Sequence, residues 1–299
     1  MTCTGNMEKR LYDKVINMIT VLTPKQAGND QQVLAMWLYD KAPGTQKIYR
    51  ADIIRFLSFA GKPLSTITIG DIQAFADTLE CASATKARIL AAIKSLFGFA
   101  KRIGYVYFDV SAAVKLPKVK NTLSERILSE SDVTRMIALE PDGRNRVMLK
   151  LLYLSGMRVS ELCRLAWRDV QGDANGVYIT VFGKGGKTRT ILLDKHIYKD
   201  LVFIRGNSGP DDPIFRSHKG SFLDPSQVWR IVRSAARRAG IGVDVSPHWF
   251  RHAHASHALE RGCPIHLVQA TLGHASVATT GRYLHARPND SSARFLCAP

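Results

Sequence analysis

The stretch "SPHWFRHAHASHALERG", residues 246–262, decides the fold of the second half of the chain. A Ser-Pro pair opens it and a glycine closes it, which are residues favoured at the start and the end of a helix. Between residues 247 and 259 this predicted helix carries four histidines and one arginine. Such a density indicates a metal site, a phosphate-handling site or an ordinary helix, and the spacing helps to choose.

Two of these residues share one face of the helix in a way that suits phosphate. His248 and His252 have the i, i+4 spacing of zinc enzymes, but the Glu of an HExxH motif is missing. Arg251, three residues after His248, would oppose a dication, whereas an arginine beside a histidine can hold phosphate oxygens and exchange a proton. We therefore predict a phosphate site at His248 and Arg251 and no metal. For His252, His254 and His257 we predict packing roles or supporting roles behind the site, without chemistry of their own.

Outward from this helix, the second half reads as helices interrupted by one hairpin. Apolar residues alternate over 177–181, a Gly-Gly turn follows at 185–186, and a β-rich run returns at 188–193. The turn "GKGGKT", 183–188, is no phosphate-binding loop, because Val181 stands where the pattern needs glycine and the turn joins two strands. Further helices are predicted to begin at Asp224-Pro225, Pro264 and Ser276.

The first half reads as helices alone, over 31–42, 45–61, 68–79 and 84–104, with Thr45, Thr68 and Ser83 as N-caps. A polar stretch with Pro117 separates the halves. The predicted class is thus mainly α with a small β-hairpin or sheet (α+β). The predicted organisation is an N-terminal extension at 1–28, a helical domain at 29–115, a linker at 116–125 and a second domain at 126–299.

Charge indicates the partner. The 299 residues carry a net charge of +17, with 17 Lys and Arg against 9 Asp and Glu in residues 1–120 and 25 against 16 in residues 121–299. Two basic halves suit two lobes that grip one long polyanion such as duplex DNA. The five cysteines are scattered, with no CxxC pair, and no apolar run has the length of a membrane span, so we expect reduced thiols and a cytoplasmic, nucleoid-associated protein without membrane contact.

Four further residues complete the phosphate hypothesis: Arg158 in "LSGMRVSEL", Lys184 at the hairpin turn, His274 in "LGHASVATT" and Tyr283 in "GRYLH". In this order and with these surroundings, the chain closely resembles the tyrosine recombinase family, which includes phage integrases and Xer recombinases. The resemblance covers nearly the whole chain. It implies a helical, SAM-like core-binding domain and a catalytic domain that together form a C-shaped clamp on DNA.

The resemblance also implies a mechanism without metal or cofactor. Tyr283 attacks the scissile phosphate and forms a 3′-phosphotyrosyl link, while Arg158 and Arg251 hold the charge of the transition state. His248 is the predicted base, because a phenol with a pKa near 10 needs help to lose its proton. Lys184 is the predicted proton donor to the 5′-oxygen, with Lys187 as the competing assignment.

Two supporting roles follow from the same resemblance. His274 is expected to hydrogen-bond a non-bridging oxygen, and Glu161, one turn after Arg158, to orient a catalytic side chain. The predicted DNA contacts, for which a solvated helix face is the alternative, are Lys47, Arg50, Lys86, Arg88, Lys94 and Lys187.

The expected function is site-specific recombination of double-stranded DNA through a Holliday junction, by a homotetramer on DNA that is a monomer or dimer when free. Type IB topoisomerase-like relaxation and catalytically idle DNA binding are the alternatives. The sequence is compatible with chromosome dimer resolution, prophage integration and element excision, with or without accessory proteins or a second recombinase.

Overall fold

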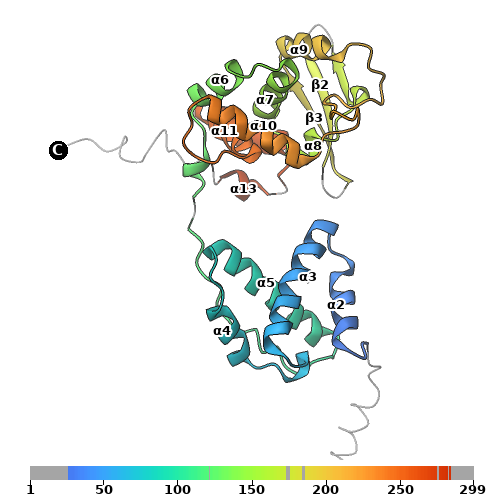
Figure 1. Ribbon diagram of the computed structural model, residues 1–299, viewed down its shortest axis with the longest axis vertical. Coiled ribbons are helices and arrows are strands. Elements are labelled where there is room, and N and C mark those ends of the chain that lie inside the picture. The colour runs from blue at the N-terminus through green and yellow to red at the C-terminus, as the bar shows by residue number, and fades with distance from the viewer. Residues whose placement is uncertain are drawn as a thin grey trace, which may run out of the picture. The chain divides into compact units, whose positions relative to one another are not determined.

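The computed structural model divides into two compact units, which separate after Lys120 (Figure 1). This point lies inside the predicted linker, and the predicted N-terminal extension lies, except for its last three residues, outside the described part of the chain. The structure describes residues 26–120, 122–172, 176–183, 186–274, 276–281 and 283.

The first unit is helical, as predicted, with a core that includes the rings of Phe56, Phe75 and Phe97. Thr68 caps its helix as expected, with a reciprocal bond from its own N–H to Asp71. The cap predicted at Thr45 is wrong: Pro43 occupies the first helical position, so the N-cap is Ala42, three residues earlier. The cap predicted at Ser83 is also misplaced by one residue, since the N-cap is Ala82. The helices are α2 (Asp30–Tyr39), α3 (Pro43–Ala60), α4 (Ile69–Asp77) and α5 (Ser83–Arg102), with a 3-10 turn at Leu64–Thr66.

Two of the basic residues predicted to contact DNA are used inside this unit. Lys94 Nζ donates hydrogen bonds to the carbonyl oxygens of Ser111, Ala112 and Val114, at 2.7–2.9 Å. An ammonium has three protons, so the DNA contact predicted for Lys94 is wrong and the residue closes the turn after α5. Arg88 forms an ion pair with Asp52, a buried carboxylate on α3, so its first role is also structural.

The second unit contains a three-stranded antiparallel sheet and eight helices in the described ranges. The predicted hairpin is present, with Val177 paired to Leu193 and Phe182 to Thr188. A third strand, β1, which was not predicted, pairs with the other edge of β2. The strands are β1 (Val170–Gly172), β2 (Val177–Phe182) and β3 (Thr188–Leu193). The helices are α6 (Glu130–Ala138), α7 (Gly143–Ser155), α8 (Val159–Leu162), α9 (Lys195–Arg205), α10 (Pro225–Arg238), α11 (Pro247–Glu260), α12 (Ile265–Leu272) and α13 (Val277–Gly281), with 3-10 turns at Ser124–Arg126 and Trp167–Asp169.

The histidine-rich stretch forms α11, which begins at Pro247 as predicted and packs against α7 in this unit (Figure 1). Phe250, Ala253 and Ala255 are buried, and Phe250 and Ala253 belong to the same core as the sheet. This packing fixes the helix, so its polar residues point in directions set by the core.

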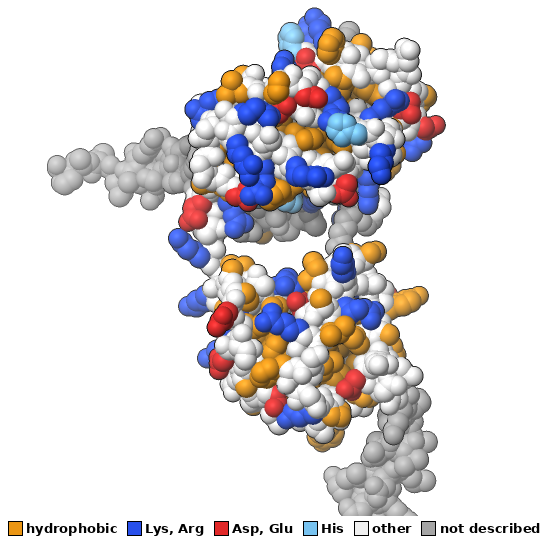
Figure 2. Space-filling model, viewed as in Figure 1, with side chains coloured by type: hydrophobic (Ala, Val, Ile, Leu, Met, Phe, Trp, Pro, Cys, Tyr) orange, Lys and Arg blue, Asp and Glu red, His pale blue; other side chains and the backbone are white. Residues whose placement is uncertain are grey.

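Basic side chains are spread over the face of each unit that Figure 2 shows. On α3, Lys47 and Arg50 are exposed, and on α5 Lys86 is half-buried. No helix in the described ranges is long and apolar enough to cross a membrane.

Candidate functional site

Arg251 lies at the centre of the candidate site, and its side chain is 4% exposed. Its Nη1 donates to the carbonyl oxygen of Gly156 and its Nη2 to that of Leu272, each at 2.7 Å. Gly156 ends α7 with a φ of 57°, and a Cβ there would lie 2.7 Å from both His254 and Leu272. A glycine is therefore required at the point where α7, α11 and α12 meet.

Glu161 joins two further arginines to this centre. Its carboxylate accepts bonds from the Arg158 backbone N–H at 2.7 Å and from Arg158 Nη1 at 2.9 Å. It also accepts a two-pronged contact from Arg189 of β3, at 3.1 and 2.8 Å, and Arg189 Nε donates to the Thr271 carbonyl at 2.7 Å. Glu161, which is expected to orient a catalytic side chain, thus holds Arg158 at the start of α8.

The charges of this network are set by burial and by each other. Burial alone would raise the pKa of Glu161, but the hydrogen bonds from Arg189 and from the Arg158 backbone outweigh it and lower that pKa to about 2. Burial, followed by repulsion from Arg158, lowers the pKa of Arg251 to about 10. At neutral pH the site therefore holds three protonated arginines and one carboxylate, a net positive field suited to an anion.

Tyr283 faces this cluster and is 6% exposed. Its backbone N–H bonds to the Thr280 carbonyl at 3.0 Å, and its ring packs with Leu272 and other apolar residues of α11 and α12. The Tyr283 hydroxyl lies 2.8 Å from Nδ1 of His252. The ring of His274 is parallel to that of Tyr283, with centroids 6.5 Å apart, and His274 Nδ1 lies 2.8 Å from the Thr280 hydroxyl.

His248 and His274 are neutral at physiological pH. Burial, with Arg251 and Arg158, lowers the pKa of His248, and the same causes together with Arg189 lower the pKa of His274 to about 4. Neutral imidazole keeps one nitrogen able to accept a proton. The site thus combines fixed cations with proton acceptors, which is the combination that phosphoryl transfer to a hydroxyl nucleophile needs.

Four of the six predicted catalytic residues meet in this cluster through side-chain contacts or electrostatic interactions: Arg158, Arg251, His274 and Tyr283. His248 joins them from the first turn of α11, with its ring 6.4 Å from that of His252. Lys184 falls outside the described residues, and the competing Lys187 is exposed, with its carbonyl accepting the Gly183 N–H at 2.7 Å.

Two residues of the site, Arg189 and His252, are not among the predicted catalytic residues. Arg189 stands on the same face of β3 as the buried Ile191 and Leu193, and a charge on the apolar face of a strand is the signal that would have found it. His252, expected to pack or to support the site, contacts the Tyr283 hydroxyl. Its i, i+4 relation to His248 on one helix face was the available signal.

Replacing Arg189 by Met is expected to weaken both folding and activity. The change leaves the buried Glu161 with Arg158 as its remaining cation, which should lower the free energy of unfolding by on the order of 3 kcal/mol. Urea unfolding checks this value. The double variant Arg189→Met/Glu161→Gln, in which no carboxylate needs a partner, should recover part of the loss; an unchanged loss would contradict the pairing explanation.

The other histidines of α11 have structural partners. His254 Nδ1 lies 2.8 Å from the Tyr153 carbonyl, so it carries the proton and donates, and His257 Nδ1 lies 2.9 Å from the Tyr153 hydroxyl. Within the described ranges, no group of three or more His, Cys, Asp or Glu is placed to hold a metal ion. These contacts agree with the packing roles predicted for His254 and His257.

His254 should make stability depend on pH. Burial lowers its pKa from 6.5 to about 4, so between these values the unfolded chain binds a proton that the folded protein does not. Stability is therefore retained above pH 6.5 and lost as the pH falls towards 4, by up to about 1.4 kcal/mol per pH unit for this group. His254→Asn keeps a donor for the Tyr153 carbonyl without titrating, so its unfolding free energy should fall less steeply over this range. An equal slope in both proteins would refute the prediction.

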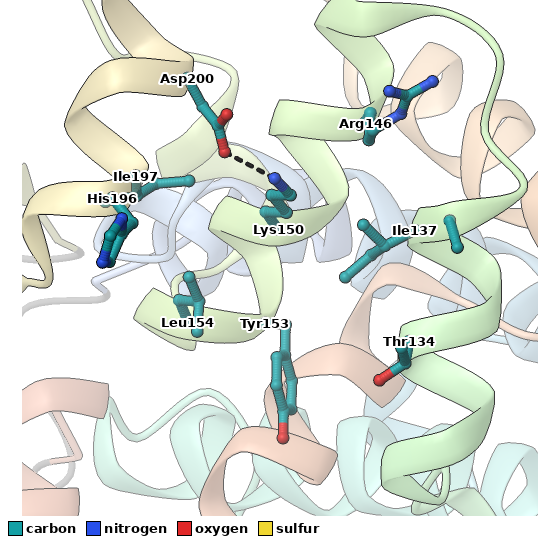
Figure 3. Close-up of a pocket in the computed structure, with 10 residues that line it drawn as sticks. Thr134, Ile137, Arg146, Lys150, Tyr153, Leu154, His196, Ile197 and Asp200 are labelled. Atoms are coloured by element: carbon teal, nitrogen blue, oxygen red, sulfur yellow. Dashed lines mark hydrogen bonds and ion pairs between the residues drawn. The ribbon is translucent and has the colours of Figure 1, made fainter.

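A hollow of about 480 Å³ lies elsewhere in this unit, between α6, α7 and α9 (Figure 3). Lys150 and Asp200 form an ion pair across it, and Ile137, Leu154 and Ile197 supply apolar walls. None of the predicted catalytic residues lines it, so the candidate site is the arginine and histidine cluster and not this hollow.

Comparisons with known proteins agree with this geometry. Residues 126–290 match the phage integrase family, and residues 37–104 match the phage integrase N-terminal SAM-like domain. The tyrosine recombinase XerD of Pseudomonas aeruginosa is 33% identical over 287 residues, which cover 89% of this chain and 95% of that protein.

Two solved structures share the fold. A lambda integrase dimer bound to a COC′ core site gives a TM-score of 0.72 at 20% identity, covering 92% of this chain and 83% of the other. A lambda integrase tetramer bound to a Holliday junction gives 0.68 at 18% identity, with coverage of 87% and 81%.

Proposed function

Because this chain belongs to the phage integrase family of tyrosine recombinases, which break and rejoin DNA at specific sites, we propose that it performs this reaction with Tyr283 as the nucleophile. The observation that carries the assignment is the position of the Tyr283 hydroxyl, 2.8 Å from a histidine nitrogen, in a cluster that contains Arg251 and His274. A phenol held next to cations and proton acceptors can lose its proton and attack a phosphodiester.

In the proposed reaction, the Tyr283 oxygen bonds to the scissile phosphorus and the bond from phosphorus to the 5′-oxygen breaks. Arg158 and Arg251 stabilise the negative charge of the five-coordinate transition state, and His274 donates to a non-bridging oxygen. Lys184 gives a proton to the departing 5′-oxygen. A 5′-hydroxyl from another strand then attacks the phosphotyrosine, so the energy of the phosphodiester is conserved and no cofactor takes part.

The proposed partner is double-stranded DNA that carries specific recombination sites. The net charge of +17, shared between both units, supports a clamp in which each unit contacts the duplex, and the exposed Lys47, Arg50 and Lys187 with the half-buried Lys86 are the proposed contacts. The lambda integrase tetramer on a Holliday junction supports a homotetramer on DNA for this chain. We also propose that it acts in the cytoplasm, at the nucleoid.

A nicked DNA duplex tests this function against its alternatives. When cleavage occurs near a nick, the short strand diffuses away and the covalent adduct is trapped, so SDS-resistant adducts from nicked fragments of the host genome identify the cleaved sequence. Joining of that sequence to a second duplex shows recombination. Relaxation of supercoiled DNA without joining would favour the topoisomerase-like alternative, and binding without adducts would favour the idle DNA-binding protein.

A further inference from the structure

His252 lies where the base of the reaction is needed. Its Nδ1 is 2.8 Å from the Tyr283 hydroxyl, and the centroids of the two rings are 5.7 Å apart. The ring centroid of the predicted base, His248, lies 6.4 Å from that of His252. A general base must lie within hydrogen-bond reach of the proton that it removes. His252 meets this criterion.

We propose that His252 is a catalytic residue that accepts the Tyr283 proton during strand cleavage, and that His248 serves the phosphate instead. The inference rests on the proposed function of Tyr283. As the bond from the Tyr283 oxygen to phosphorus forms and the bond to the 5′-oxygen breaks, the phenolic proton passes to His252 Nδ1. In the ligation step, the protonated His252 returns this proton to the departing phenolate, so protons and electrons balance over the cycle.

The surroundings hold both partners of this transfer in place. His252 follows Arg251, whose guanidinium is anchored on two backbone carbonyls, so this turn of α11 cannot shift without breaking those bonds. Tyr283 is held by the Thr280 carbonyl and by its buried ring. To accept the proton, Nδ1 must keep its lone pair, which requires the tautomer with hydrogen on Nε2.

The arginines support the same direction of transfer. Arg251 interacts electrostatically with Tyr283, and a cation near a phenol favours the phenolate. His248 lies near Arg251 and Arg158, the two residues proposed to hold the phosphate. Its position in the first turn of α11 thus suits a hydrogen bond to a non-bridging oxygen, while His252, one turn further, serves the nucleophile.

The test uses the full-length protein and the nicked duplex selected by wild-type adduct formation, and it measures the single-turnover rate of adduct formation. His252→Ala should lower this rate by on the order of 100-fold, the usual contribution of a general base. His252→Asn, whose amide oxygen can accept the phenolic bond but is no base, should be similarly slow while folding as the wild type does. His248→Ala is the matched control on the same helix face.

Making the nucleophile more acidic separates a base from a packing residue. With 3,5-difluorotyrosine at position 283, the phenol ionises without help, so the rates of His252→Ala and His252→Asn should recover at least about tenfold, and that of His248→Ala should not. The inference is overturned if His252→Ala cleaves at the wild-type rate, if its defect is the same with both nucleophiles, or if His248→Ala alone recovers. A wild type that forms no adduct would overturn the proposed function, and this inference with it.

Discussion

A Tyr283→Phe protein is expected to form no covalent adduct with DNA, while binding the same DNA as tightly as the wild type. The change removes one oxygen atom, the proposed nucleophile, and leaves a ring of the same size among the apolar neighbours of Tyr283. Since the covalent link uses that oxygen, we expect the loss to exceed a 10⁴-fold decrease in rate, beyond the contribution of a single supporting group. Denaturing gels of the nicked duplex measure the adduct, and a mobility shift measures binding.

Tyr153→Phe is the matched control. The Tyr153 hydroxyl contacts His257 on the same helix that holds His252, so its loss reports any general disturbance of α11. Adduct formation should persist in Tyr153→Phe. Adducts in Tyr283→Phe, or their absence in both variants with folding intact, would contradict the assignment of the nucleophile.

Local signals account for the parts of the fold that the sequence predicted well. The caps at Thr68 and Asp224, the prolines that open α10 and α11 and the alternation of β2 are each fixed by neighbours within four residues. The third strand escaped prediction because Val170–Gly172 is only three residues long and is defined by its pairing to β2. Such a short segment carries no periodicity of its own.

The site shows the same division between local and distant contacts. The family resemblance implied the role of Glu161, and its partner Arg158 lies only three residues away. Arg189, 28 residues from Glu161, and Tyr283, 31 residues from His252, meet their partners only through tertiary packing. Lys94 failed for the same reason, because the carbonyls that it binds lie 17–20 residues later, in a turn without a sequence signature. The charge of Lys94 alone does not distinguish a lysine that binds these carbonyls from a lysine that contacts DNA.

Arg158→Ala is expected to keep its fold and to lose cleavage by on the order of 10³-fold, the effect of removing one donor to the charge of a transition state. Arg158 is the better arginine to test, because its side chain is 35% exposed. When Arg158 is replaced, Glu161 still forms its ion pair with Arg189. Arg251 instead holds two backbone carbonyls, so its loss would disturb folding and chemistry together.

The size of the Arg158 defect should depend on the charge of the DNA. In a duplex whose scissile phosphate carries a methyl group in place of one non-bridging oxygen, the transition state gathers less negative charge there, so Arg158→Ala should lose far less rate relative to the wild type. On ordinary DNA, the cleavage rate of Arg158→Lys should fall between those of the wild type and Arg158→Ala. An ammonium supplies charge but not the planar pair of hydrogen bonds that a guanidinium forms. Equal rate defects on the charged and the methylated phosphate would show that Arg158 acts through structure alone. Arg251 would then be the remaining candidate for the residue that binds the anion near Tyr283.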